Sequence, residues 1–109
     1  MTTPIDETMA FLMHHCVRFA KKGEKLILLD DSNTQTSELY LYKRGVSHIP
    51  DLSMVEGLVH LNLAGNPIQD ISPLAKLTEL LLLDIEDNTG VHIPVDILKK
   101  ALPHCRVYA

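Results

Sequence analysis

Hydrophobic and polar positions alternate in two short stretches near the middle of the chain. LVHLNLA at 58–64 and LLLLDIE at 80–86 place a branched aliphatic residue at every second position. A period of two sets one side of a strand against a core and leaves the other side exposed. Both stretches therefore predict short strands with one buried face.

The hydrophobic positions also recur along the chain at a spacing of 22 residues from Thr36 onward. Three sets of positions share this spacing: Leu39, Leu61, Leu83 and Cys105; then Leu41, Leu63, Ile85 and Val107; then Ile49, Ile71 and Ile93. Self-similarity at a fixed period of this size is typical of repeat proteins, because one repeat alone cannot hide its apolar face. We therefore expect stacked, similar units.

The second unit reads LxxLxLxxNxIxxIxxLxxL, and within it lies NPIQDISPLAKLTEL. This pattern resembles the leucine-rich repeat family and, more narrowly, the 22-residue repeats of bacterial internalin-like proteins. The resemblance covers residues 36–109, about two thirds of the chain. It implies an α/β fold in which a short leucine-rich repeat solenoid of about three coils plus a closing strand carries an N-terminal capping helix.

Asparagine is expected to turn the chain after each strand. Asn66 and Asn88 follow the second and third strands, whereas Arg44 holds the equivalent place after the first. A buried amide can satisfy backbone groups that a tight turn leaves without partners. Ser72 and Pro73 then predict the N-cap and first position of a short helical return segment.

The N-terminal part predicts an amphipathic helix, because apolar residues from Ile5 to Ala20 recur at helical spacing. Thr3 with Asp6 resembles a capping box, and Gly23 is expected to end the helix. A single domain then divides into a helical cap at 1–23, a strand and turn at 24–35, repeats at 36–101 and a closing half-repeat at 102–109. Whether the strand at 25–29 joins the repeat sheet stays open.

Composition narrows the class of protein. The 109 residues carry a net charge of −4, which argues against a nucleic-acid partner, because such binding needs a basic surface. Apolar runs such as the four leucines at 80–83 are far shorter than the roughly 20 residues of a membrane-spanning helix, so no membrane span is expected. The N-terminus lacks the basic region of a signal peptide, and Cys16 and Cys105 both fit buried, reduced thiols. A cytoplasmic protein is predicted.

Partners of leucine-rich repeat proteins usually bind the concave face, so the resemblance implies that the strand residues pointing away from the core form the binding site. All three tyrosines of the chain fall at such positions. Tyrosine is enriched in binding hot spots, although it also suits exposed strands for packing alone. The candidate partner-binding residues are Tyr40, Tyr42, His60, Asn62, Leu82, Asp84, Glu86, His104, Arg106 and Tyr108.

Two features of this face suggest the kind of partner. Leu82 lies at its centre and is either an ordinary exposed leucine or an apolar anchor. Asp84, Glu86 and Asp87 form an acidic patch beside it, which suits a basic partner or is simply a solvated edge.

Catalytic chemistry is not predicted. The chain has no GxSxG, HExxH, P-loop or GxGxxG motif. His48, Asp70 and His92 share one phase of three successive repeats, which would permit a surface zinc site, but the Asp70 position fits a turn residue better. We therefore expect no enzyme, no metal and no cofactor.

The sequence thus predicts a non-catalytic protein–protein interaction module. One specific form is a bacterial immunity or inhibitor protein that covers a basic toxin or enzyme. The alternative is a scaffold that self-associates through exposed strand edges as a homo-oligomer. A small metal-dependent enzyme at His48 and His92 is the third hypothesis.

Overall fold

The computed structural model describes residues 3–90 and 94–109, beginning with helix α1 (Pro4–His14). Its capping box is confirmed: the backbone N–H of Asp6 donates to Thr3 Oγ1, and the backbone N–H of Thr3 donates to Asp6 Oδ2, both at 3.2 Å. The prediction that the helix continues to Gly23 is wrong. Cys16 adopts a left-handed conformation with a φ of 58°, and the chain leaves the helix there.

Residues 19–36 form a separate antiparallel sheet instead. It contains β1 (Phe19–Lys22), β2 (Lys25–Leu29) and β3 (Gln35–Thr36), in the order β1-β2-β3. Lys22 pairs with Lys25, so Gly23, with a φ of 62°, lies in a tight hairpin turn and does not end a helix. The predicted strand at 25–29 is confirmed as β2. It does not belong to the parallel sheet that the 22-residue spacing predicted.

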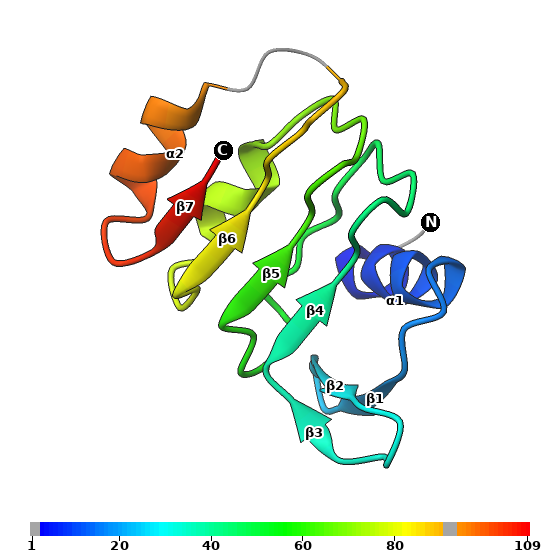
Figure 1. Cartoon of the computed structure of the whole chain (residues 1–109). Helices are drawn as coiled ribbons and strands as arrows, with labels where there is room; N and C mark the ends of the chain where they lie inside the picture. The colour runs from blue at the N-terminus through cyan, green and yellow to red at the C-terminus, as the bar shows by residue number, and fades with distance from the viewer. Residues whose placement is uncertain (1–2, 91–93) are drawn as a thin grey trace.

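The second sheet is parallel and has four strands, which lie side by side in Figure 1 with their arrowheads pointing the same way. They are β4 (Glu38–Tyr40), β5 (His60–Asn62), β6 (Leu82–Asp84) and β7 (Arg106–Tyr108), in that order. The 3₁₀ helix η1 (Ser72–Lys76) connects β5 to β6, and helix α2 (Val95–Ala101) precedes β7. The predicted N-cap at Ser72 is wrong, because Ile71 holds that place without a side-chain bond.

The strand register departs from the repeat at its end. Leu39 pairs with Leu61 and Leu61 with Leu83, at the expected offset of 22 residues. Leu83 then pairs with Val107, 24 residues later, and not with Cys105. The segment that contains α2 is therefore two residues longer than the segment before it.

The predicted fold class, a short leucine-rich repeat solenoid, is therefore wrong. The described residues form a small α/β structure with α1, α2, an antiparallel three-stranded sheet and a parallel four-stranded sheet. The overall extents are 34 × 30 × 26 Å, so the molecule is not elongated along a repeat axis. The prediction failed because residues 19–36 make a hairpin-based sheet and because two extra residues before β7 shift the register of the last strand.

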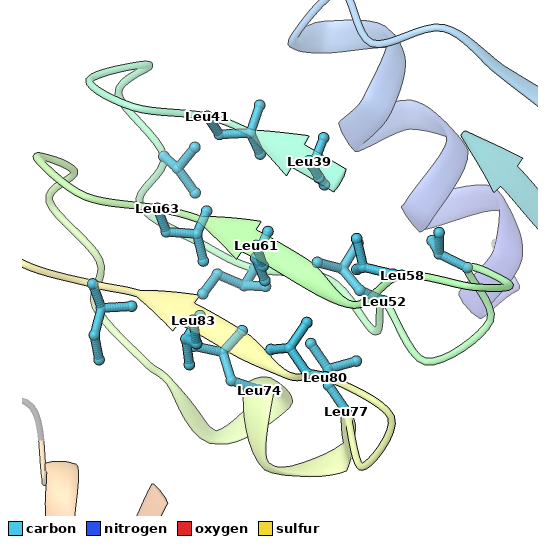
Figure 2. Packing of buried hydrophobic residues seen from close by; sticks show 14 of the residues in the cluster. Leu39, Leu41, Leu52, Leu58, Leu61, Leu63, Leu74, Leu77, Leu80 and Leu83 are labelled. Carbon is cyan, nitrogen blue, oxygen red and sulfur yellow. The ribbon is translucent and has the colours of Figure 1, made fainter. Parts of the chain in front are cut away.

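The core lies on one side of the parallel sheet. Figure 2 shows Leu39, Leu61 and Leu83 on the same side of β4, β5 and β6. Leu52, Leu74 and Leu77, from the segments between the strands, pack with them. Leu61, Leu74 and Leu83 are fully buried. Within the described residues, no helix is long and apolar enough to cross a membrane.

Candidate functional site

The other side of the parallel sheet presents two rows of side chains, here called the exposed face. The strand register places Glu38, His60, Leu82 and Arg106 in the first row, and Tyr40, Asn62, Asp84 and Tyr108 in the second. Neighbouring strands in such a sheet lie about 4.8 Å apart. Tyr42 and Glu86 continue the face beyond the ends of β4 and β6.

One of the candidate residues lies off this face. His104 lies in the turn before β7, because the final register is shifted by two residues. Leu82 lies in the first row between His60 and Arg106 and is half-buried. Leu81, which precedes β6, is the exposed leucine instead, with 58% of its surface accessible. Leu81 shares the odd-numbered positions of Leu83 and Ile85, and the alternating pattern predicts burial there. Nothing in the sequence therefore indicates that Leu81 is exposed.

The three tyrosines are the exposed large hydrophobic side chains of this face among the described residues. Tyr40 is 51% exposed, Tyr42 50% and Tyr108 41%. Asn62 and Asp84, on the two inner strands, are half-buried. The second row therefore has long, accessible rings at its ends and short polar side chains in its middle.

Tyr40 is held by two neighbours. Its hydroxyl group donates a hydrogen bond to Glu38 Oε2 at 2.5 Å and lies 3.4 Å from His60 Nδ1. The rings of Tyr40 and His60 meet edge to face, with centroids 5.0 Å apart. The hydrogen bond to the Glu38 carboxylate raises the pKa of Tyr40 above its ordinary value, because it favours the neutral phenol.

Tyr42 is flanked by a cation. Lys43 Nζ lies 5.3 Å from the centre of the Tyr42 ring, within the range of a cation–π contact. Gly65 lies against the same pair: a Cβ atom there would be 2.7 Å from Lys43 Cγ and 3.5 Å from the Tyr42 ring. A side chain at Gly65 would therefore displace the Lys43 side chain, and the φ of 73° also favours glycine there.

Carboxylates gather where β6 ends. Asp84 Oδ1 accepts a hydrogen bond from the backbone N–H of Glu86 at 3.0 Å. The negative charge of Asp84 is the main cause that raises the pKa of Glu86, and Asp87 adds to it. Across residues 3–90 and 94–109, no lysine or arginine forms an ion pair with Asp84, Glu86 or Asp87.

His48, Asp70 and His92 share one phase of the repeat, and the structure describes the contacts of the first two. Asp70 accepts hydrogen bonds from the backbone N–H and the hydroxyl group of Ser72, both at 2.9 Å, so it acts as a turn residue. His48 Nδ1 lies 3.0 Å from Ser47 Oγ. His92 lies outside the described residues, among which no three His, Cys, Asp or Glu side chains are placed to hold a metal ion.

The two cysteines belong to no metal-binding cluster among the described residues. Both thiols are free, and Cys105 is half-buried, which raises the pKa of its thiol. Cys16 is exposed, so the expectation that it is buried on a helical stripe is wrong. The early end of α1 moves it into a turn.

A hollow between α1 and residues 45–50 was not predicted from the sequence. Its volume is about 590 Å³, and its lining includes Phe11, His14, His15 and His48. Partial burial, followed by the positive neighbours His14 and Arg44, lowers the pKa of His15. These histidines come from segments more than 30 residues apart, so spacing along the chain gave no sign of them.

Comparisons with protein-family models, with curated proteins and with solved structures find no match for this chain. The resemblance to leucine-rich repeat proteins therefore stays a prediction from the sequence.

Proposed function

We propose that this chain is a non-catalytic protein-binding module whose partner docks on the exposed face of β4–β7. The observation that carries the proposal is the placement of all three tyrosines on this face, each 41–51% exposed. Tyrosine offers a large, rigid contact area at a small entropic cost and is enriched in binding hot spots. A sheet face that only contacts solvent has no need to carry all three tyrosines of the chain.

Charge supports a basic partner. Asp84, Glu86 and Asp87 lie beside the tyrosines without an ion-pair partner in the described part of the chain. Complementary charge speeds association and selects among partners. An immunity or inhibitor protein that covers a basic toxin or enzyme is the specific form that we propose, acting in the cytoplasm, where two free thiols stay reduced.

Affinity capture from a lysate of the source cells, read by mass spectrometry, tests this proposal. The wild-type chain is compared with Tyr40→Ala/Asp84→Lys, which alters the exposed face. Met13→Ala/Asp96→Lys is the matched control, because it makes the same kinds of change at Met13, 67% exposed, and at exposed Asp96 on α2. Urea unfolding first shows that both variants are folded.

A basic partner that the face variant loses and the control retains is the expected result. A partner retained by both variants would place the binding site elsewhere and overturn the proposal. Capture of further copies of this chain alone would support the self-associating scaffold instead.

A further inference from the structure

The shape of the second row limits what can lie on the exposed face, if the face binds a protein as proposed above. Tyr40 and Tyr108 are separated by three strand spacings, about 14 Å. Between them stand Asn62 and Asp84, whose side chains are much shorter. An α-helix with its side chains is about 10–12 Å across. The span between the Cα atoms of Tyr40 and Tyr108 therefore matches the width of one helix.

The length of the face also suits a helix. From Glu38 to Tyr42 the chain advances by about 13 Å in extended conformation. A helix covers that length in about nine residues, which is two to three turns. A second sheet packed on this face would instead have to pass over the exposed rings of Tyr40 and Tyr108, because sheets pack about 10 Å apart along flat faces.

The charges on the face give the helix a direction. Asp84 is the last residue of β6, and Glu86 and Asp87 follow it, so the negative charge gathers where the strand ends. The N-terminal end of a helix carries partial positive charge, and it is stabilised by nearby carboxylates. The favoured arrangement therefore runs opposite to the strands, with the helix N-terminus near Asp84.

The residues at the centre of the exposed face indicate which side chains of a partner helix would contact it. Half-buried Leu82 offers an apolar contact at the centre of the first row, beside His60. An aliphatic side chain over Leu82 and a lysine or arginine near Asp84 and Glu86 would match both groups. A partner segment with these two features on one side is an amphipathic basic helix.

We infer that the exposed face binds one amphipathic, basic α-helix of the partner, laid along the strands between Tyr40 and Tyr108 with its N-terminal end at Asp84 and Glu86. Tyr40 is the better fixed of the two rings, because Glu38 and His60 both hold it. The inference rests on the proposed function and specifies the class of partner segment.

The test is a selection from two displayed libraries against the whole folded chain. One library presents randomised helices of about fifteen residues on a rigid helical scaffold, because free helices of that length are marginal. The other presents randomised loops of equal length. Each is first depleted on the variant Tyr40→Ala/Asp84→Lys/Tyr108→Ala, so that only binders of the exposed face remain. Asp96→Lys is the control for charge reversal away from the face.

The expected binders are helices with aliphatic residues at helical spacing and lysine or arginine in their N-terminal half. Asp84→Lys should weaken them by about tenfold or more, whereas Asp96→Lys should not. Moving the basic residues to the C-terminal half, or placing proline at the helix centre, should also abolish most of the binding.

The remaining outcomes separate the inference from the proposed function. Loop binders or acidic helices that still require Asp84 and the tyrosines would overturn the inference of a basic helix. They would leave the proposed function of the exposed face standing. If neither library yields a binder that depends on the exposed face, both the helix inference and the proposed function are overturned.

Discussion

Asn66 Oδ1 lies 2.9 Å from the backbone nitrogen of Arg44, the residue 22 positions earlier, and accepts its hydrogen bond. The same oxygen accepts from the backbone N–H of Val46 at 3.0 Å. The Nδ2 atom donates to the carbonyl oxygens of Leu41 and Leu63, both at 2.8 Å. Asn66 is fully buried, so one side chain serves the backbone of two successive turns.

Replacing Asn66 by alanine should be among the most destabilising single changes in the chain. It removes several hydrogen bonds and leaves buried backbone N–H groups without acceptors, at an expected cost of about 3–5 kcal/mol in the free energy of unfolding. Urea unfolding measures this cost, with Gln69→Ala, at an exposed neighbour, as the control. A loss below about 1 kcal/mol would show that water replaces the amide.

The role of Asn66 was predictable because the sequence repeats around it. The alternation at 58–64 placed Leu61 and Leu63 in the core, and the capping box placed the start of α1. Arg44 broke the asparagine pattern, yet its turn is still fixed, since Arg44 contributes only its backbone N–H to Asn66. The repeat therefore predicted local contacts correctly even where one residue departed from it.

The overall fold was less predictable for three local reasons. Nothing in the residues marks Cys16 as left-handed, so the helix was expected to continue. Gly23 suits a helix end and a hairpin turn equally well, and only the pairing of β1 with β2 decides between them. The two extra residues before β7 shift its register, which removed His104 from the candidate site while Arg106 and Tyr108 stayed on it.

Gly90 should tolerate no side chain. A Cβ atom there would lie 2.2 Å from the carbonyl oxygen of Ile68. Ile68 cannot easily move, because its backbone N–H donates to Asn88 Oδ1 at 2.7 Å. We expect Gly90→Ala to cost about 2–3 kcal/mol of unfolding free energy, measured in urea.

Gly45→Ala is the matched control for this change. A Cβ atom at Gly45 meets open space, and only the φ of +71° opposes it, at about 1 kcal/mol. Equal losses for the two alanine variants would mean that the turn at Gly90 relaxes.

Two aspartates should make stability depend on acid pH. Hydrogen bonds from Ser53 lower the pKa of Asp51, and hydrogen bonds from Ser72 lower that of Asp70. Such a group stabilises the fold fully above its unfolded pKa, near 3.8, and loses the effect as pH falls through its lowered native pKa. Asp51→Asn and Asp70→Asn should therefore lower stability at neutral pH and flatten its decline below about pH 4.

Thermal unfolding between about pH 2 and pH 7 measures this effect. Asp31→Asn, at an exposed turn position, is the control for loss of one negative charge. Curves for Asp51→Asn and Asp70→Asn that stay parallel to the wild-type curve would show that the serine hydrogen bonds contribute nothing.

The hydrogen bond from Tyr40 to Glu38 should be visible in the titration of the phenol. The bond raises the pKa of Tyr40 above 10, so replacing Glu38 by glutamine, which removes the charge, should bring the pKa back toward that value. NMR of ¹³C-labelled tyrosine rings measures the titration, and Tyr40→Phe assigns the signal. Glu56→Gln removes an equal charge outside the face and should leave it unchanged. An unchanged pKa of Tyr40 in Glu38→Gln would mean that the hydrogen bond to Glu38 does not hold the ring in solution. The proposed helix site would then lose the better fixed of its two tyrosines.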